Sequence, residues 1–210
     1  MELPDSRDTH ATAIDAPAAY RQGIEAIGEI AARFTAATWN AQTPCLEWRA
    51  ADLAGHLRCV TDDYHEYLDN APVSRLARLM ATGGSAERIA RKLARQNSAE
   101  LAALPDVPPE EHIRAFAESA TAYTARLGPL LRLPHHTYQG QMITVAGMGG
   151  MALVEWHVHA WDLAVALGES YRPDDPEAVL AGWMAGIPHL AIVPDRDPWV
   201  TVLRSAGRLK

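Results

Sequence analysis

The chain has 210 residues, which suits one domain, or one domain with a small appendage, and leaves ample length for a core. Hydrophobic residues make up 48% and charged residues 21%, as is ordinary for a globular protein, and the net charge of −7 argues against a nucleic-acid partner. No apolar run is long enough to span a bilayer, and the acidic start lacks the order of a signal peptide. We therefore expect a cytoplasmic protein with no membrane partner.

The first half of the chain predicts helices separated by polar or glycine-containing breaks. Residues 1–14 are polar and are expected to form a flexible N-terminus. Apolar residues at helical spacing then predict helices over residues 16–39, 50–69 and, in two shorter pieces divided at Gly83-Gly84, 75–101. Ser85 is the expected cap of the second short helix.

The second half also predicts helices, joined by loops rich in proline and glycine. They cover residues 109–127, 142–167 and 176–185. Gly168 is a favourable C-terminal cap for the middle one, whose glycine-rich first turns are its least regular part. Residues 134–136 are expected to form a loop, and the tail from Pro188 predicts no definite form.

These elements together predict an all-α protein. No alternation of strands and no internal repeat is visible, so we expect long antiparallel helices arranged as a four-helix bundle, with additional short helices and a short C-terminal tail. The expected organisation is a flexible segment over 1–14, a helical bundle over 15–187 and a tail over 188–210 that packs on the bundle. Bundle cores are places where metals are bound by side chains of facing helices.

The most informative stretch is residues 154–163, which combine polar and core-like residues on one predicted helix. Glu155 and His159 are four residues apart and so lie on the same helix face, and Asp162 follows three residues later. Burying such groups is costly unless they are paired or bound to a metal. Carboxylate and imidazole are ordinary zinc ligands, so a divalent metal is one explanation and a simple hydrogen-bonded pair is the other.

A third ligand would come from another helix, and His56 is the best candidate because it borders the apolar stripe of the helix over 50–69. Asp52 could accept a hydrogen bond from the other ring nitrogen of His56, and Asp162 could do the same for His159. Two histidines and one glutamate leave at least one coordination position open. That is the pattern of a catalytic rather than a structural zinc site.

Other residues with metal-binding or reactive side chains fit this site less well. His157 is two residues from both Glu155 and His159 and therefore faces away from them, and His65 is expected on the surface. His135-His136 is expected to be a solvated loop pair, and Cys59 a small buried residue, although it could serve as a soft ligand or reactive thiol. With only two cysteines, no disulfide framework is expected. The arginines of 75–95 most often indicate a solvated face, with an anion-binding role as the alternative.

Two stretches resemble a known family. They are Trp-Arg-Ala-Ala-Asp-Leu-Ala-Gly-His-Leu over 48–57 and Glu-Trp-His-Val-His-Ala-Trp-Asp-Leu-Ala over 155–164. In this order they resemble the mycothiol-dependent maleylpyruvate isomerase N-terminal-type proteins of the DinB-like four-helix-bundle superfamily, over about residues 16–187. The endings Asp195 to Trp199 and Gly207-Arg208 resemble the ends of such chains.

The resemblance implies that His56, Glu155 and His159 bind a divalent metal, usually zinc, and that a low-molecular-weight thiol of the mycothiol type is the co-substrate. The segment after the bundle is shorter than the separate domain that completes the isomerase site, so we expect thiol transfer or another activity rather than maleylpyruvate isomerisation. The expected function is activation of the thiol for transfer to, or isomerisation of, a small electrophile. Alternatives are a metal-dependent hydrolase or lyase on the same bundle, and a non-catalytic metal-binding structural or stress-response protein.

Overall fold

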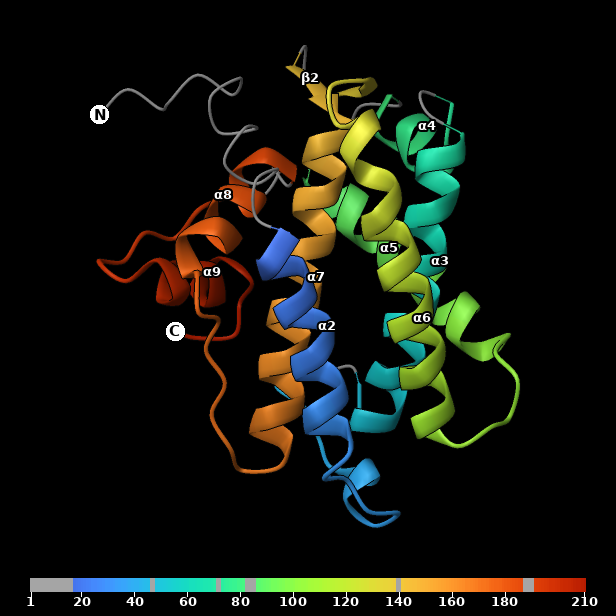
Figure 1. The fold of residues 1–210 in the computed structure, drawn as a ribbon, viewed down its shortest axis with the longest axis vertical. Helices are drawn as coiled ribbons and strands as arrows, with labels where there is room; N and C mark the ends of the chain where they lie inside the picture. The colour runs from blue at the N-terminus through green and yellow to red at the C-terminus, as the bar shows by residue number, and fades with distance from the viewer. Residues whose placement is uncertain (1–16, 46–47, 71–72, 82–85, 139–140, 187–190) are drawn as a thin grey trace.

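The computed structural model describes residues 17–45, 48–70, 73–81, 86–138, 141–186 and 191–210. Within them the chain is predominantly helical (Figure 1). The α-helices are α2 (Pro17–Ala31), α3 (Ala50–Asp69), α4 (Arg75–Ala81), α5 (Ala86–Ala102), α6 (Pro109–Leu127), α7 (Val145–Ala166), α8 (Pro176–Gly186) and α9 (Pro198–Ser205). Two short 3-10 turns, η1 (Thr38–Asn40) and η2 (Gly128–Leu130), and two strands, β1 (Pro134–Tyr138) and β2 (Gln141–Thr144), complete the described elements.

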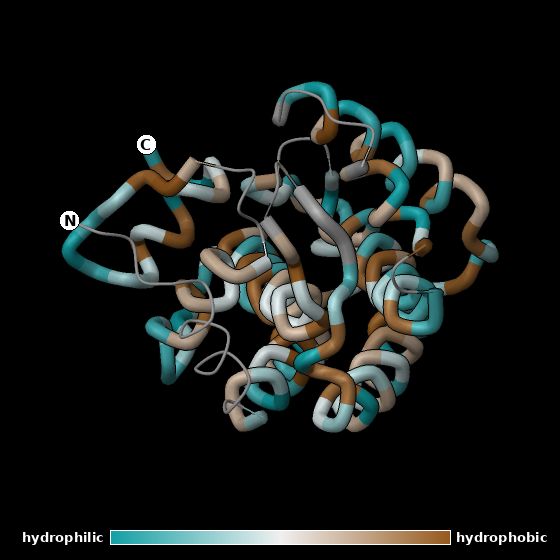
Figure 2. Tube along the Cα trace, turned by 90° about the horizontal axis from the view of Figure 1, so that it is seen from above, coloured by the Kyte–Doolittle hydropathy of each residue, from teal (hydrophilic) through white to brown (hydrophobic). Residues whose placement is uncertain are grey.

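The predicted DinB-like all-α fold is confirmed. Helices α2 and α3 each contact both α6 and α7, so the four long helices close around a common core (Figure 1). Helix α8 packs on α7, and α9 packs on α8. Helices α8 and α9 lie to one side of these four helices (Figure 1), and in the view from above the C-terminus is on the same side (Figure 2). The bundle therefore has α7 at the junction between the four helices and the C-terminal segment.

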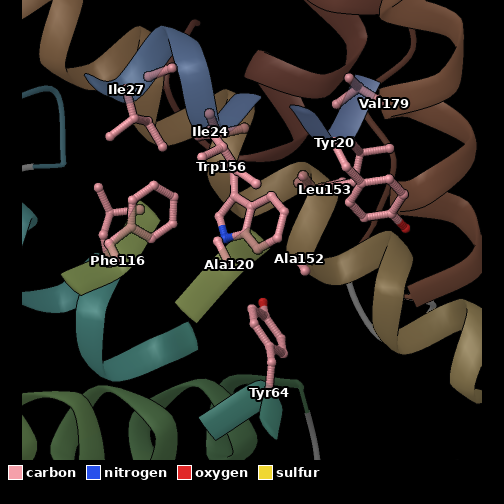
Figure 3. Close-up of a cluster of buried hydrophobic side chains, with 14 of the residues drawn as sticks. Tyr20, Ile24, Ile27, Tyr64, Phe116, Ala120, Ala152, Leu153, Trp156 and Val179 are labelled. Carbon is pink, nitrogen blue, oxygen red and sulfur yellow. The ribbon is translucent and has the colours of Figure 1, made fainter. Parts of the chain in front are cut away.

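Trp156 of α7 is the centre of an aromatic cluster in the core. Its fully buried indole makes edge contacts with Tyr20 of α2 and Phe116 of α6, each at a ring-centroid distance of 5.9 Å (Figure 3). Edge-to-face packing of this kind adds to the stabilisation from apolar burial. Because Trp156 must face this cluster, the rotation of α7 is fixed, and residues 155 and 159 are directed toward α3 instead.

The glycines at the start of α7 allow α8 to approach it closely. A Cβ atom on Gly150 would lie 2.6 Å from the carbonyl oxygen of Gly182, so neither helix could carry a side chain at this crossing. Glycine lowers helix propensity, but here the contact between the two helices requires it. The glycine-rich turns are accordingly helical, although α7 begins at Val145 and not at residue 142.

The prediction of one helix from 16 to about 39 is wrong in its second half. Helix α2 ends at Ala31, and the chain turns so that the rings of Phe34 and Trp39 stack at 4.3 Å. The indole Nε1 of Trp39 donates to Glu110 Oε1 of α6 at 2.6 Å. Apolar residues at helical spacing were therefore packed by a turn instead of by a continued helix.

The predicted loop at 134–136 is in fact the start of an antiparallel hairpin, in which β1 pairs with β2. The prediction of solvation also fails for His135, which is fully buried and whose Nε2–H donates to the backbone oxygen of Tyr67 at 2.9 Å. Each strand is too short to show an alternating pattern. Ile143 in β2 is buried and continues the apolar spacing of α7, which is why the sequence favoured a longer helix.

The tail contains α9, which begins at a clear cap. Asp197 Oδ1 accepts hydrogen bonds from the backbone N–H groups of Trp199 at 2.8 Å and Val200 at 3.4 Å. Trp199 and Val202 are buried on the side that meets α8. The run from Trp199 to Leu203 is rich in β-branched residues, but capping and packing make it helical. The predicted flexible segment 1–14, Gly83-Gly84 and Ser85 lie outside the described residues.

Candidate metal centre

Two neighbouring helices of the bundle bring the three predicted ligands together. His56 is on the inner face of α3, and Glu155 and His159 are one turn apart on α7. Glu155 Oε2 lies 2.9 Å from His159 Nε2 and 3.9 Å from His56 Nε2. The three possible ligand atoms all lie within 4.8 Å of one another. Among the residues that the structure describes, this is the group of His, Cys, Asp and Glu side chains that could hold a metal ion.

The donor atoms fit a zinc-like ion both chemically and in spacing. Zinc bound at 2.0–2.1 Å in a tetrahedral arrangement places its ligand atoms about 3.3 Å apart. The 2.9 and 3.9 Å separations lie on either side of that value and the third pair lies within 4.8 Å, so side-chain adjustment would bring the three atoms to the spacing of a bound ion. Two neutral imidazoles and one carboxylate form a usual donor set for an open zinc site.

A second layer of contacts surrounds His159. Its Nδ1 lies 2.9 Å from Asp162 Oδ2, and Asp162 is fully buried. Arg208, beyond the end of α9, donates from Nε to Asp162 Oδ1 at 2.8 Å and from Nη2 to Oδ2 at 2.9 Å. With Nδ1 held by Asp162, the Nε2 of His159 is the nitrogen directed toward Glu155.

Asp52 lies elsewhere than predicted. Its Oδ2 accepts the backbone N–H of Arg49 at 3.0 Å and so closes the first turn of α3. Between these two described residues, Asp52 and His56, the structure gives no hydrogen bond. The spacing that predicted Asp52 as an orienting partner of His56 also places the Asp52 carboxylate in the first turn of α3. A carboxylate there is favourable as a capping group.

The pKa values in this cluster are set by burial and by the neighbouring charges. Burial disfavours the charged form of His159, but hydrogen bonds with Asp162 and Glu155 outweigh it and raise its pKa to about 8. Burial also acts to raise the pKa of Glu155, yet the two imidazoles hold it well below its usual range. For His56, burial is the main cause of a lowered pKa, with partial compensation by Glu155. Without a metal, His159 is thus the proton-bearing member of the cluster.

The cluster forms one wall of a cavity of about 250 Å³. The rings of Trp48 and His56 lie 4.2 Å apart, and the side chain of Glu155 keeps 30% of its surface exposed. The cavity is lined by the segment before α3, by α3, α5, α7 and α8, and by the turn after α9: Cys45, Trp48, His56, Asn97, Val154, Glu155, Val158, His159, Trp183, Ala206 and Arg208. A small molecule in this space would meet apolar walls and the open side of the metal centre.

The remaining histidines considered from the sequence are held in other contacts. His157 is fully buried on the opposite side of α7, where its Nε2–H donates to Ala19 O at 2.8 Å and its Nδ1 accepts from the Tyr171 hydroxyl at 2.5 Å. His65 is half-buried rather than a surface residue, with contacts from Nε2 to Ser119 O at 3.0 Å and from Arg126 Nη1 to Nδ1 at 2.8 Å. Cys59 is also half-buried, and burial raises the pKa of its thiol to about 11.

The arginines of 75–95 do not all act alike. Arg75 is paired with Asp63 and, through Nη1, with Glu100 Oε1 at 2.6 Å. Arg95 is exposed, and together with Trp48, Ala94 and Ser98 it lines a groove of about 390 Å³. Trp48 is common to this groove and to the cavity of the metal centre. One member of the basic run therefore lies in a groove that adjoins the candidate site at Trp48.

Sequence reasoning did not assign roles to Trp48, Asn97, Trp183 or Arg208. Trp48 and Arg208 fell within stretches quoted for the family resemblance, but nothing in their spacing tied them to His56 or Asp162. One signal was available for Arg208. A carboxylate as buried as Asp162 needs a positive partner in addition to a histidine, and arginine is suited to two-pronged binding of carboxylates.

The family described as the mycothiol maleylpyruvate isomerase N-terminal domain matches residues 20–164. No curated protein and no solved structure matches the chain. In the described part of the chain, no helix is both long and apolar enough to cross a membrane. The matched region contains all three candidate ligands but ends before Trp183 and Arg208.

Proposed function

The chain belongs to the mycothiol maleylpyruvate isomerase N-terminal domain family, and on this premise we propose that it is a cytoplasmic zinc-dependent enzyme that activates a low-molecular-weight thiol of the mycothiol type. The thiol would be transferred to, or used to isomerise, a small electrophilic substrate. The observation that carries the proposal is the convergence of His56, Glu155 and His159 at the wall of an accessible cavity.

Each residue of the centre has a defined task in this proposal. His56 and His159 would offer neutral imidazole nitrogens, and Glu155 the negative charge that partly balances the ion. Asp162 accepts the Nδ1–H of His159 and fixes its ring. When bound, a divalent ion would lower the pKa of a thiol in the cavity and so supply a thiolate near neutral pH. The protein then needs no nucleophile of its own.

The cavity walls favour a substrate with an apolar or planar part. Trp48, Val154 and Val158 provide apolar surface next to the ligands. Such surface excludes water from the reacting atoms and strengthens the electrostatic interactions made there. The electrophile would therefore lie against the Trp48 indole, within reach of the thiol sulfur.

Arg95 is our candidate for binding an anionic group of the thiol or substrate. Its side chain lines the groove that adjoins the cavity at Trp48, and it forms no ion pair with any residue that the structure describes. Arginine binds carboxylates through a rigid, two-pronged hydrogen-bonding face. A ligand with its sulfur at the metal centre and a carboxylate at Arg95 would cross the Trp48 indole.

Metal content and thiol use test the proposal. The purified protein should contain about one zinc or similar divalent ion per chain, and His159→Ala should lose it. The matched control is His65→Gln, which changes another histidine of α3. Its ring contacts Ser119 and Arg126 instead of the residues of the metal centre. Turnover of an aryl halide should then require both the metal and mycothiol, with glutathione and thiol-free samples as comparisons.

The same assay separates the alternative functions. Metal-dependent turnover of an ester or hydrolysable substrate without any thiol would favour a hydrolase or lyase on the same bundle. Metal binding without turnover of any substrate would favour a structural or stress-response protein. Unchanged metal content in His159→Ala would show that the proposed ligand set is wrong.

A further inference from the structure

We propose that the C-terminal segment is a working part of the metal centre and that Arg208 is its positioning residue. Arg208 would act through Asp162, which in turn holds the ring of His159 in the orientation of a ligand. The inference rests on the proposed metal centre, but it concerns a residue that lies outside the region matched by the family. The inference is based on the contacts of Arg208 and on the turn after α9 that places its side chain beside Asp162.

Each of the three side-chain nitrogens of Arg208 donates a hydrogen bond to a protein oxygen. Besides its Nε and Nη2 contacts with Asp162, its Nη1 donates to the backbone oxygen of Ala206 at 2.9 Å. The side chain is only 16% exposed, although it borders the cavity. Each of its three side-chain nitrogens thus has a protein partner without any substrate, and its hydrogen bonds to the centre all go to the Asp162 carboxylate.

The turn after α9 directs Arg208 back toward α7. Gly207 has a φ of +71°, a left-handed conformation that glycine adopts without a steric penalty. The backbone N–H of Arg208 donates to Leu203 O at 2.8 Å and that of Gly207 to Arg204 O at 2.9 Å, which closes the helix end. Since Trp199 and Val202 anchor α9 by burial, this turn places the guanidinium at a fixed position over Asp162.

Asp162 could not hold its place as well with His159 alone. It is 0% exposed, so its charge receives no solvation from water. Removing one partner of a buried ion pair leaves an uncompensated charge, which is strongly destabilising and is relieved by rotation of the side chain or entry of water. Either change would release the Nδ1 of His159. Partners of this outer kind usually contribute 10- to 100-fold to metal affinity.

A double-mutant cycle in metal affinity tests the inference. Zinc dissociation constants are measured by competition with a chromogenic chelator for the wild type, Arg208→Gln, Asp162→Asn and the double variant. We expect each single variant to bind zinc about 10- to 100-fold more weakly. The double variant should be no worse than Asp162→Asn, because the hydrogen bonds that connect Arg208 to the centre all go to Asp162.

The control is Arg204→Gln, which removes an arginine in the last turn of α9 whose Nη1 lies 3.2 Å from Asp195 Oδ2. It should bind zinc as the wild type does. Arg208→Lys retains the charge but not the two-pronged contact, so it should give an intermediate affinity, and it replaces Arg208→Gln if that variant does not fold.

The outcomes also separate this inference from the proposed function. If the wild type binds no zinc, the metal centre itself is wrong. If the wild type binds zinc and Arg208→Gln binds it equally well, or if the two single effects add in the double variant, only the role of Arg208 is overturned. As a reciprocal readout, zinc should slow tryptic cleavage after Arg204 in the wild type and do so less in Arg208→Gln.

Discussion

Two histidines on opposite sides of α7 show that the neighbouring groups, and not burial alone, determine the pKa and the role of a buried imidazole. His157 is 0% and His159 4% exposed, so both imidazoles are buried. His157 lies between two neutral groups, the Ala19 carbonyl and the Tyr171 hydroxyl, and burial lowers its pKa to about 4. His159 lies between two carboxylates, and despite the same burial its pKa rises to about 8.

The difference explains which side of the helix can do chemistry. On the His157 side, both ring nitrogens are hydrogen-bonded to protein groups, so neither is available to a ligand. On the other side, His159 lines a cavity together with Glu155 and Arg208, and the buried Asp162 adds a further charge. Buried charge of this kind is costly for stability, so its presence beside a cavity favours a functional role.

The largest expected effect is on metal binding. Its absence would contradict the difference between the two sides of α7. A zinc site in a protein is worth about 10–16 kcal/mol, or about 3 kcal/mol for each of four ligands. His159→Ala should therefore weaken zinc binding by more than about a hundredfold. His157→Gln, two residues away, should leave the zinc stoichiometry unchanged. Elemental analysis and chelator competition measure both, and equal losses in the two variants would show that the two sides of α7 are not distinct.

The second effect is on the stability of the fold. Here the substitution of His157, not that of His159, is the informative one. His157→Ala leaves a cavity and strips the Ala19 carbonyl and the Tyr171 hydroxyl of their partner. We expect the free energy of unfolding to fall by about 2–4 kcal/mol. Denaturation in the presence of a chelator measures this effect without a contribution from bound metal. A loss below about 0.5 kcal/mol would contradict the structural role given to His157.

Stability should also respond to pH in opposite directions on the two sides. The lowered pKa of His157 means that the unfolded chain takes up a proton first, so stability is intact above about 6.5 and decreases by about 3 kcal/mol as the pH falls toward 4. The raised pKa of His159 stabilises the metal-free fold below about 6.5, and about 2 kcal/mol of this is lost as the pH rises through 8.

These pH effects are measured as differences from matched variants. Urea denaturation of the metal-free wild type is compared with His157→Gln on the acid side and with His159→Gln on the alkaline side. Between about pH 6.5 and 5, above the range in which Glu155 and Asp162 take up protons, the slope should decrease only in the first variant, and the alkaline-side slope should decrease only in the second. Identical slopes in all three proteins would mean that neither pKa shift exists in solution.

The smallest expected effect concerns the groove beside the centre. Arg95→Ala removes an exposed cation that makes no ion pair with the described residues, so neither stability nor zinc content should change. The KM for the thiol or substrate should rise about 5- to 30-fold, corresponding to one charged hydrogen bond of about 1–2 kcal/mol, with kcat little altered. Arg91→Ala, on an exposed part of the same helix, is the control. A fall in kcat at constant KM would assign Arg95 a different task.

Much of this arrangement could be predicted from periodicity and spacing alone. The helices over 50–69 and 109–127 were predicted with the bounds observed for α3 and α6. His56 was selected because it borders an apolar stripe, and that stripe does face α7. Local rules are reliable here because each long helix buries one continuous face, and a ligand at its border necessarily points toward the next helix.

Contacts between distant segments were beyond those rules. The turn that ends α2 depends on Trp39 reaching Glu110, and the hairpin at 134–144 depends on His135 reaching Tyr67. Arg208 had no local pattern to distinguish it from any other arginine near a chain end. In each case the decisive partner is far away in the sequence, and tertiary packing overrides the local preference.

The Arg208–Asp162 contact has a consequence for the time course of synthesis. Asp162 leaves the ribosome about fifty residues ahead of Arg208, which at about 5–20 residues per second means several seconds. During that interval α7 can pack on α2 and α3, but its buried carboxylate has no cation to meet it and must keep water. The final compaction around His159 therefore has to wait until the segment after α9 has emerged, whatever the rate at which the bundle itself forms.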